Sequence, residues 1–205
     1  MLVLVRHGET AANAAHLLQG RMDPPLTERG RRQAQALSAV GRTAALVVCS
    51  PLRRARETAA AIQAGDGAQG EGTVVEASIE VDERWIEIDY GELDGRPVDG
   101  SWQPLWERWR ADPEFTPPGG ESLASVGRRV SAACQELAEQ AASADVVVVT
   151  HVSPIKAAVT WALGVGDEAA WRMFCDIASV TRIDMADRGP VLRSFNEVHH
   201  LAGVR

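Results

Sequence analysis

The chain begins with MLVLVRHGETAAN (residues 1–13), in which a short apolar run meets Arg6, His7 and Gly8. The run LVLV (2–5) has the β-branched and aliphatic composition of a buried strand. A guanidinium and an imidazole are costly to pack at the end of such a strand. Their position is explained if the end of the strand holds an anion that the imidazole attacks.

Two later segments repeat this pattern of strand, polar junction and helix. AALVV (44–48) leads through Ser50-Pro51 into a helical stretch, and DVVVV (145–149) leads through His151 and Ser153-Pro154 into another. Each Ser-Pro pair is predicted to start a helix as its N-cap and first-turn proline. Continuous apolar strands that alternate with helices predict an α/β fold, a three-layer α/β/α sandwich with a mostly parallel central sheet.

Weaker patterns predict the remaining elements. The 205 residues suit a single domain, 1–205, with a short helical insertion near 96–120. The other expected elements are helices at 27–40, capped by Thr27, and at 121–141, strands at 75–81, 178–185 and 191–198, and a flexible loop at 64–72.

The topology predicts a phosphate pocket before any family is considered. The carboxyl ends of parallel strands lie along one edge of a sheet, where helix N-termini favour anions. This edge would gather Arg6 and His7, the arginines that follow residue 52, and His151. The guanidinium group of arginine can donate two parallel hydrogen bonds to phosphate oxygens, and a neutral imidazole can attack phosphorus. The acidic stretch DERWIEIDYGELDG (82–95) is the best source of a carboxylic acid to protonate the leaving group.

Composition excludes several classes of protein. A net charge of −7 argues against a nucleic-acid binder, and no segment approaches the roughly 20 apolar residues of a membrane span. Three cysteines without metal-ligand spacing indicate free thiols and a cytoplasmic protein. A homodimer is compatible with the sequence.

These motifs, taken in order, resemble those of the histidine phosphatase superfamily, the phosphoglycerate mutase-like proteins. The matching pieces are RHGET with Asn13, GRMDPPLTERGRRQA (20–34), SPLRRARETA (50–59), EIDYGELDG (87–95), PGGESLASV (118–126) and the second histidine after a valine strand. The resemblance implies that His7 is the nucleophile, that Arg6 and Arg54 clamp the phosphate, and that His151 completes the pocket. It further implies that Glu87 is the proton donor, that Asn13 touches the phosphate or substrate, and that neither a metal nor an organic cofactor is needed.

The chain departs from the family pattern after the last of these strands. The family usually has His-Gly-Gly followed by an arginine, whereas this chain has His-Val-Ser-Pro-Ile and then Lys156, its only lysine. Trp102, Trp106 and Trp109 recur at helical spacing, which favours an amphipathic helix packed on the body over a lid above the substrate.

The expected function is that of a metal-independent phosphomonoesterase, which hydrolyses a small phosphorylated metabolite through a phosphohistidine. The alternatives are a cofactor-dependent phosphoglycerate mutase, a non-catalytic phospholigand sensor, and a metal hydrolase that uses the two histidines. Only about 25 residues separate the acidic loop from PGGES, and this short spacing favours the phosphatase over the mutase.

Overall fold

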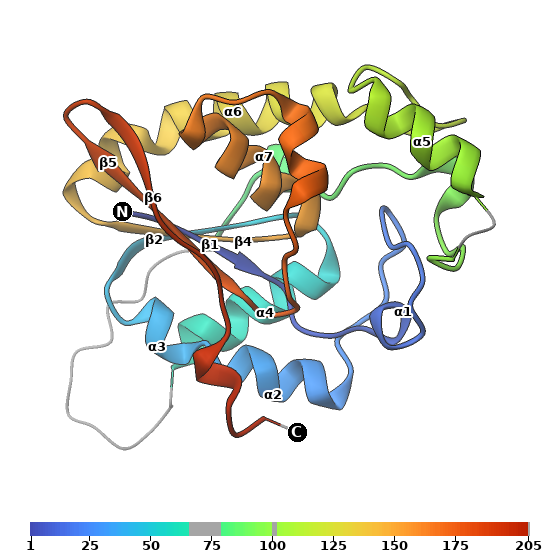
Figure 1. The fold of residues 1–205 in the computed structure, drawn as a ribbon. Coiled ribbons are helices and arrows are strands. Elements are labelled where there is room, and N and C mark those ends of the chain that lie inside the picture. Colours follow the sequence, from blue (N-terminus) through green and yellow to red (C-terminus); the bar gives the residue numbers. More distant parts are fainter. Residues whose placement is uncertain (66–78, 100–101, 205) are drawn as a thin grey trace.

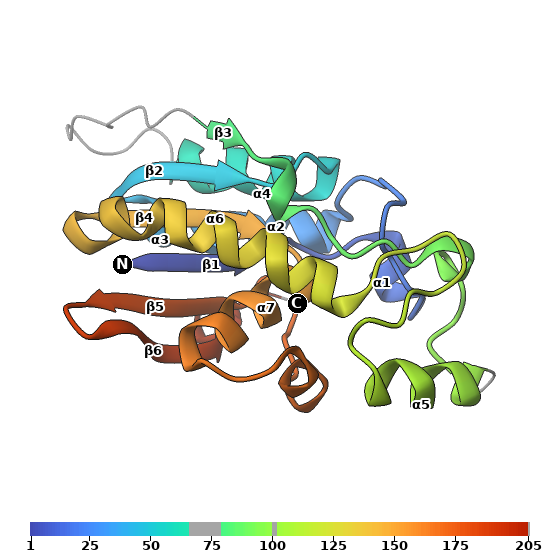
Figure 2. The same ribbon diagram turned by 90° about the horizontal axis from the view of Figure 1, so that it is seen from above.

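The computed structural model describes residues 1–65, 79–99 and 102–204, in which a six-stranded sheet lies between two layers of helices (Figure 1). The strand order is β3-β2-β4-β1-β5-β6, which can be followed across the sheet in Figure 2. The strands are β1 (Leu2–Arg6), β2 (Ala44–Cys49), β3 (Ile79–Val81), β4 (Asp145–Thr150), β5 (Val180–Ala186) and β6 (Gly189–Glu197). The α/β fold is therefore confirmed.

The sheet is mixed, and its parallel part carries the three strands that the sequence singled out. Strands β3, β2, β4 and β1 run parallel, whereas β5 pairs antiparallel with both β1 and β6. The turn between β5 and β6 is shorter than the gap between the expected strands 178–185 and 191–198, because β6 already begins at Gly189. The segment 75–78 of the expected third strand, and residues 66–72 of the expected loop, lie outside the described residues.

Helices cover both faces, because alternate side chains of every central strand are apolar and buried. Leu2 and Leu4 of β1 point to the face covered by α6 (Leu123–Ser143) and α7 (Val152–Leu163). Val3 and Val5 point to the opposite face. That face is covered by α2 (Glu28–Ala36), α3 (Ser38–Gly41) and α4 (Arg53–Ala64).

Helix starts test the capping predictions. Thr27 caps α2, with its hydroxyl accepting a hydrogen bond from Gly30 N at 3.0 Å, but the predicted helix 27–40 is broken at Leu37. The two Ser-Pro predictions are wrong. Helix α4 begins at Arg53, two residues after Pro51, and α7 begins at Val152, so Ser153 lies within its first turn. The physical reason is that both serines are engaged elsewhere, as described below.

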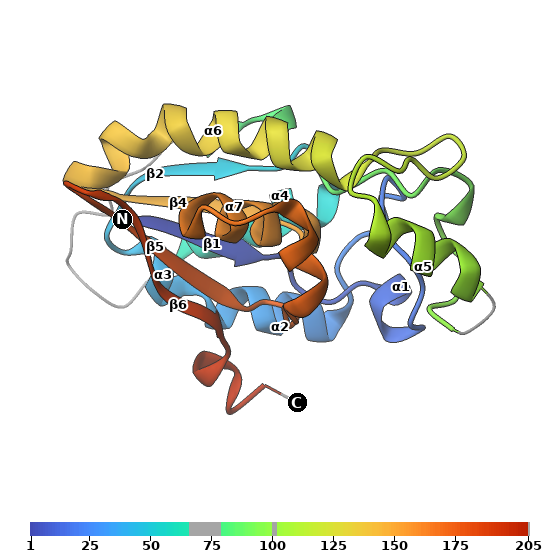
Figure 3. The ribbon, with the colours of Figure 1, turned by 45° about the horizontal axis from the view of Figure 1, so that its top comes forward.

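The remaining helices lie beyond the ends of the strands. The short α1 (Ala11–Ala14) follows the opening motif, and α5 (Gln103–Ala111) is the helix expected in the insertion. Figures 1 and 3 place both of them past the carboxyl end of β1. Single turns of 3-10 helix occur at Glu83–Trp85, Gly91–Leu93 and His199–Leu201, and a longer one at Asp167–Arg172.

Trp109 of α5 is buried, which supports the packing interpretation of the tryptophans. Its ring stacks on Trp106 with centroids 5.6 Å apart, and meets Trp171 edge-on at 5.9 Å. Trp102 packs against the same cluster.

Candidate active site

Strand register brings the two predicted histidines together. Arg6 pairs with Thr150 across the parallel strands β1 and β4, and the N–H of His7 donates to the carbonyl of Thr150 at 3.0 Å. His7 and His151 directly follow the last residues of these two strands, and their ring centroids lie 5.0 Å apart. Both side chains are buried, with 3% and 0% of their surface exposed.

Arg54 lies between the two imidazoles. Its Nε is 3.2 Å from Nε2 of His7 and 3.2 Å from Nδ1 of His151. Its two terminal nitrogens donate to the carbonyls of Gly20 and Met22, at 2.8 and 2.7 Å. Burial lowers the pKa of Arg54 to about 10, so the guanidinium stays charged at neutral pH. Helix α4 thus directs a cation into the site from its first turn.

The hydrogen bonds of His7 fix which of its nitrogens is free. Nδ1 lies 2.7 Å from the carbonyl of Gly8, which can only accept, so Nδ1 carries the proton and Nε2 presents a lone pair. Burial, Arg54 and Arg6 hold the pKa of His7 well below its usual value. The imidazole is therefore neutral at physiological pH, which is the state that a nucleophile requires.

Ser50 orients the second imidazole instead of capping a helix. Its hydroxyl lies 2.7 Å from Nε2 of His151 and also accepts from the N–H of Leu52 at 3.3 Å. Because Arg54 donates toward Nδ1, the proton of His151 lies on Nε2 and points to Ser50. Burial, followed by the charge of Arg54, holds the pKa of His151 well below its usual value.

Glu87 caps helix α7 from outside the helix. Its carboxylate accepts from the N–H groups of Val152 and Ser153, both at 3.1 Å, and from Ile88 at 2.8 Å. The side chain is buried, and it lies near enough to Arg6 for the two charges to interact. The free N–H groups of a helix N-terminus bind anions, so they place this carboxylate directly beside His151.

Two buried donors of the site have no partner among the described residues. They are Nε of Arg6, whose Nη1 donates to the carbonyl of Cys175 at 2.6 Å, and Nε2 of Gln19. The amide oxygen of Gln19 accepts from the hydroxyl of Thr10 at 2.6 Å, which leaves the amide nitrogen free. Unpaired buried donors are costly, and a bound oxyanion would satisfy them. Gln19 directly precedes the matched segment 20–34 and was missed, because its burial depends on tertiary packing.

Asn13, which the resemblance assigns to phosphate or substrate binding, is hydrogen-bonded within the loop that follows His7. Its side chain completes a capping box with Thr10, accepting from both the N–H and the hydroxyl of that residue at 3.1 and 3.0 Å. It also lines an open cavity of about 770 Å³ that Arg6 borders. Asn13 therefore faces an approach to Arg6 and shapes the loop that follows His7.

Asp94, an acidic residue near Glu87, has a structural role. Asp94 accepts hydrogen bonds from the N–H groups of Gly20, Arg21 and Met22 at 2.7–2.8 Å, and thereby fixes the two carbonyls that hold Arg54.

Arg53, adjacent to Arg54, is exposed and pairs with Glu57 at 2.6 Å. The structure thus separates the buried arginine of α4 from its solvated neighbour.

The fold and this cluster define a histidine phosphatase, and the comparisons agree. The model of the histidine phosphatase superfamily, branch 1, matches residues 2–198, and the chain belongs to this family. Phosphoserine phosphatase 1 of Hydrogenobacter thermophilus is 35% identical over 208 residues, which cover 98% of this chain and 93% of that protein. Family membership, fold and phosphatase class are therefore confirmed.

Two further proteins extend the comparison. The structure of Bacillus stearothermophilus YhfR has a TM-score of 0.83 and 28% identity, and the match covers 98% of both chains. A bifunctional protein of Mycobacterium tuberculosis is 34% identical over 208 residues, and this chain spans only 54% of its length. The activities of that longer protein therefore carry no conclusion here.

Proposed function

We propose that the protein is a metal-independent phosphomonoesterase that hydrolyses a small phosphorylated metabolite through a phosphohistidine at His7. The observation that carries this proposal is the pair of 3.2 Å contacts from one buried guanidinium nitrogen to Nε2 of His7 and Nδ1 of His151. A neutral imidazole with a free lone pair and a cation at the same point suits nucleophilic attack on a phosphate ester.

In the first half-reaction, Nε2 of His7 forms a bond to phosphorus while the bond from phosphorus to the ester oxygen breaks. Glu87 must enter this step in its protonated form, and it gives that proton to the departing oxygen. Arg6 and Arg54 stabilise the charge on the phosphoryl oxygens, and the unpaired amide nitrogen of Gln19 donates to the same group. His151 contributes a donor when its proton moves from Nε2 to Nδ1, the nitrogen that faces Arg54.

In the second half-reaction, Glu87 removes a proton from water, and the water oxygen attacks phosphorus. The bond from phosphorus to Nε2 breaks, releasing inorganic phosphate and regenerating neutral His7. The cycle consumes one ester and one water and gives one alcohol and one phosphate, with Glu87 returned to its starting state.

The relatives support the class of substrate but not one compound. The relative from Hydrogenobacter is named a phosphoserine phosphatase, which acts on a small phosphorylated molecule. Within the described residues, no cluster of three or more His, Cys, Asp or Glu side chains could hold a metal ion, and no helix is long and apolar enough to cross a membrane. The homodimer, the cytoplasmic location and the lack of nucleic-acid partners stay predictions, which sedimentation, cell fractionation and nucleic-acid binding assays test.

The test is phosphate release from aryl and alkyl phosphates in the presence of a strong chelator. We expect turnover that the chelator leaves unchanged, together with an acid-labile, base-stable phosphoenzyme after a rapid quench. Loss of turnover with chelator would favour a metal hydrolase, and binding of phosphate esters without turnover would favour a sensor. Strong stimulation by a bisphosphoglycerate primer would favour the mutase.

A further inference from the structure

The hydroxyl of Thr150 connects two parts of the active site. Thr150 is the last residue of β4 and directly precedes His151. Its side chain is fully buried, and its Oγ1 donates a hydrogen bond to the carbonyl oxygen of Trp85 at 2.5 Å. Trp85 stands two residues before Glu87, on a segment 65 positions away in the chain. The strand that leads to His151 therefore also holds the segment that carries Glu87.

The main chain of Thr150 is held by the strand that leads to the other histidine. Thr150 pairs with Arg6 across β1 and β4, and its carbonyl accepts from the N–H of His7 at 3.0 Å. Both strands lie inside the sheet, with a neighbouring strand on each side. Because such central strands are the least mobile part of a fold, the hydroxyl extends toward Trp85 from a fixed position.

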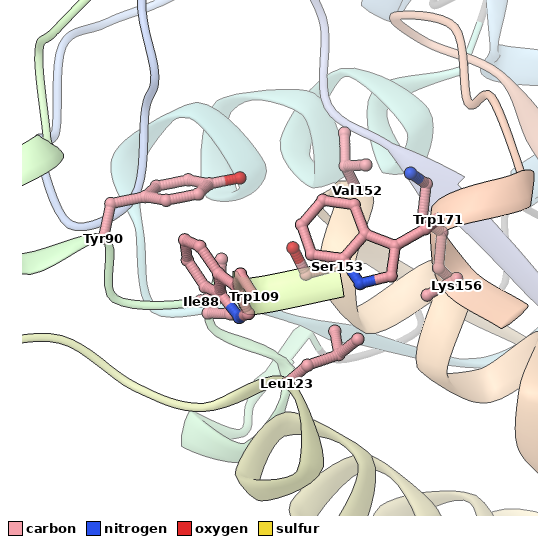
Figure 4. Close-up of a pocket in the computed structure, with 9 residues that line it drawn as sticks. Ile88, Tyr90, Trp109, Leu123, Val152, Ser153, Lys156 and Trp171 are labelled. Atoms are coloured by element: carbon pink, nitrogen blue, oxygen red, sulfur yellow. The ribbon is translucent and has the colours of Figure 1, made fainter. Parts of the chain in front are cut away.

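The segment that carries Glu87 is packed less completely on one side. A cavity of about 60 Å³ lies beside it, and its lining includes Ile88, Val152 and Ser153 (Figure 4). These three residues are the ones whose N–H groups donate to the Glu87 carboxylate. Side chains that line a cavity make fewer contacts on that side, so packing resists a small displacement less there. The position of Glu87 therefore depends on hydrogen bonds as well as on packing.

A second hydrogen bond holds the same segment from another helix. Nη1 of Arg129, in α6, donates to the carbonyl of Arg84 at 2.5 Å, one residue before Trp85. Of the two bonds, the one from Thr150 starts at the residue next to His151. It therefore relates the segment of Glu87 directly to the side chains that would bind the phosphate.

We propose that Thr150 is a positioning residue whose hydroxyl fixes Glu87 relative to His7 and His151. The hydroxyl acts through the carbonyl of Trp85 and is not itself a catalytic group. This inference rests on the proposed function, because it needs Glu87 to transfer a proton to the leaving group. A misplacement of about 1 Å can lower a rate about 100-fold. Loss of the hydroxyl should therefore impair proton transfer to the leaving group and spare the attack by His7.

The test uses two esters that differ in their need for a proton. Thr150→Val removes the hydroxyl and keeps a branched side chain of similar shape. With glycerol 3-phosphate, whose alkoxide needs a proton to leave, kcat should fall by roughly 10- to 100-fold. With p-nitrophenyl phosphate it should change less than about threefold. Phenyl phosphate, whose phenolate leaves less readily than nitrophenolate, replaces glycerol 3-phosphate if that ester is not turned over.

Two further variants distinguish the hydrogen bond from a loss of stability. Thr150→Ser retains the donor and should keep the wild-type ratio of the two kcat values. The matched control is Thr160→Val, because Thr160 is also buried and its hydroxyl donates to the carbonyl of Ala157 at 2.9 Å. Both valine variants should lower Tm by about 2–4 °C, since each loses one hydrogen bond. Only Thr150→Val should change the ratio, and Thr150→Ala replaces it if it does not fold.

A double variant tests whether Thr150 acts through Glu87. In the Glu87→Gln background, Thr150→Val should leave the ratio of the two kcat values unchanged to within about twofold, because the acid that it positions is already absent. An effect on general folding would instead lower kcat in both backgrounds by the same factor.

The outcomes separate the two proposals. An unchanged ratio in Thr150→Val, equal losses for the two esters, or a ratio that changes again in the Glu87→Gln background would overturn the positioning role and leave the phosphatase in place. A wild-type ratio in Glu87→Gln itself would overturn the assignment of Glu87 and this inference with it. Failure of the wild-type protein to release phosphate from any ester would overturn the proposed function.

Discussion

His7 and His151 lie 144 positions apart in the chain, yet their rings are 5.0 Å apart and both face Nε of Arg54. The register of β1 and β4 accounts for the proximity, because both strands end at paired residues. Arg54 belongs to α4, which covers the face of the sheet opposite to α7, the helix that follows His151. Three separate parts of the chain therefore meet at one point.

Replacing His7 with alanine should abolish the phosphoenzyme. The nucleophilic nitrogen is lost, and by analogy with other nucleophile deletions kcat should fall by about 10⁴-fold or more. Stopped-flow release of p-nitrophenol and a quench for labelled phosphoenzyme measure both effects. His199→Ala is the control, because His199 is exposed and its ring stacks edge-on against His200, away from the two catalytic imidazoles in the chain. Near-normal turnover of His7→Ala would rule out the nucleophile assignment.

Arg54→Ala should reduce kcat/KM by roughly 10²- to 10³-fold, like the removal of an oxyanion donor. The neighbouring variant Arg53→Ala should change it less than about twofold, because the exposed Arg53–Glu57 pair contributes little. Steady-state kinetics with p-nitrophenyl phosphate tests the contrast. Equal losses in the two variants would mean that Arg54 acts only through the stability of α4.

The histidine–arginine cluster illustrates what sequence patterns determine. Valine-rich strands followed by polar junctions predicted the parallel part of the sheet and the edge at which Arg6, His7, Arg54 and His151 meet. Resemblance to the family was needed to select Arg54 from its neighbours. Composition alone does not distinguish two adjacent arginines at the start of one helix, and only one of them is buried.

Other features depend on contacts between distant residues. Ser50 and Ser153 look like N-caps locally, but His151 engages the first and the distant carboxylate of Glu87 engages the N–H of the second. The antiparallel placement of β5 beside β1 likewise has no local signal, since either edge of the parallel strands could accept it. Patterns along the chain therefore predicted most helices and strands, but not the hydrogen bonds and the strand pairing that depend on distant residues.

Glu87→Gln should slow alkyl phosphates far more than aryl phosphates. An alkoxide needs a proton as it leaves, whereas a nitrophenolate departs without one. Comparison of kcat for glycerol 3-phosphate and p-nitrophenyl phosphate measures the difference. Glu83→Gln, an exposed change four residues earlier, should affect neither substrate. Equal damage to both substrates by Glu87→Gln would exclude Glu87 as the acid.

Gly30→Ala should destabilise the loop that carries His7. A Cβ at Gly30 would lie 2.1 Å from the carbonyl oxygen of Glu9, so the backbone of the loop or of α2 must shift. Overpacking of this kind costs about 1–3 kcal/mol, which urea unfolding detects. Gly203→Ala is the control, because a Cβ there meets nothing within 4 Å. Unchanged stability of Gly30→Ala would mean that the loop relaxes freely.

Stability should fall as the pH drops below about 6.5, the ordinary pKa of histidine in an unfolded chain. The pKa values of His7 and His151 are both lowered in the folded protein. At pH 7.5 and above, about one unit over that pKa, both imidazoles are almost entirely neutral in either state and contribute little pH dependence. Below that pKa, the two histidines bind protons in the unfolded chain but not in the folded protein. The free energy of unfolding therefore falls by about 1.4 kcal/mol per histidine for each pH unit, until the pH reaches the pKa of the folded state.

Urea unfolding at pH 7.5, 6.5 and 5.5 in phosphate-free buffer measures this slope, since bound phosphate would itself stabilise the folded state. His7→Gln and His151→Gln should each flatten the slope, because glutamine does not titrate, and the double variant should flatten it most. His199→Gln should keep the wild-type slope, since His199 is exposed. His200, whose pKa burial also lowers, and the carboxylates are present in all these variants, so the difference between slopes reports on the two imidazoles. A double variant with the wild-type slope would show that the buried pair is not the source of acid sensitivity.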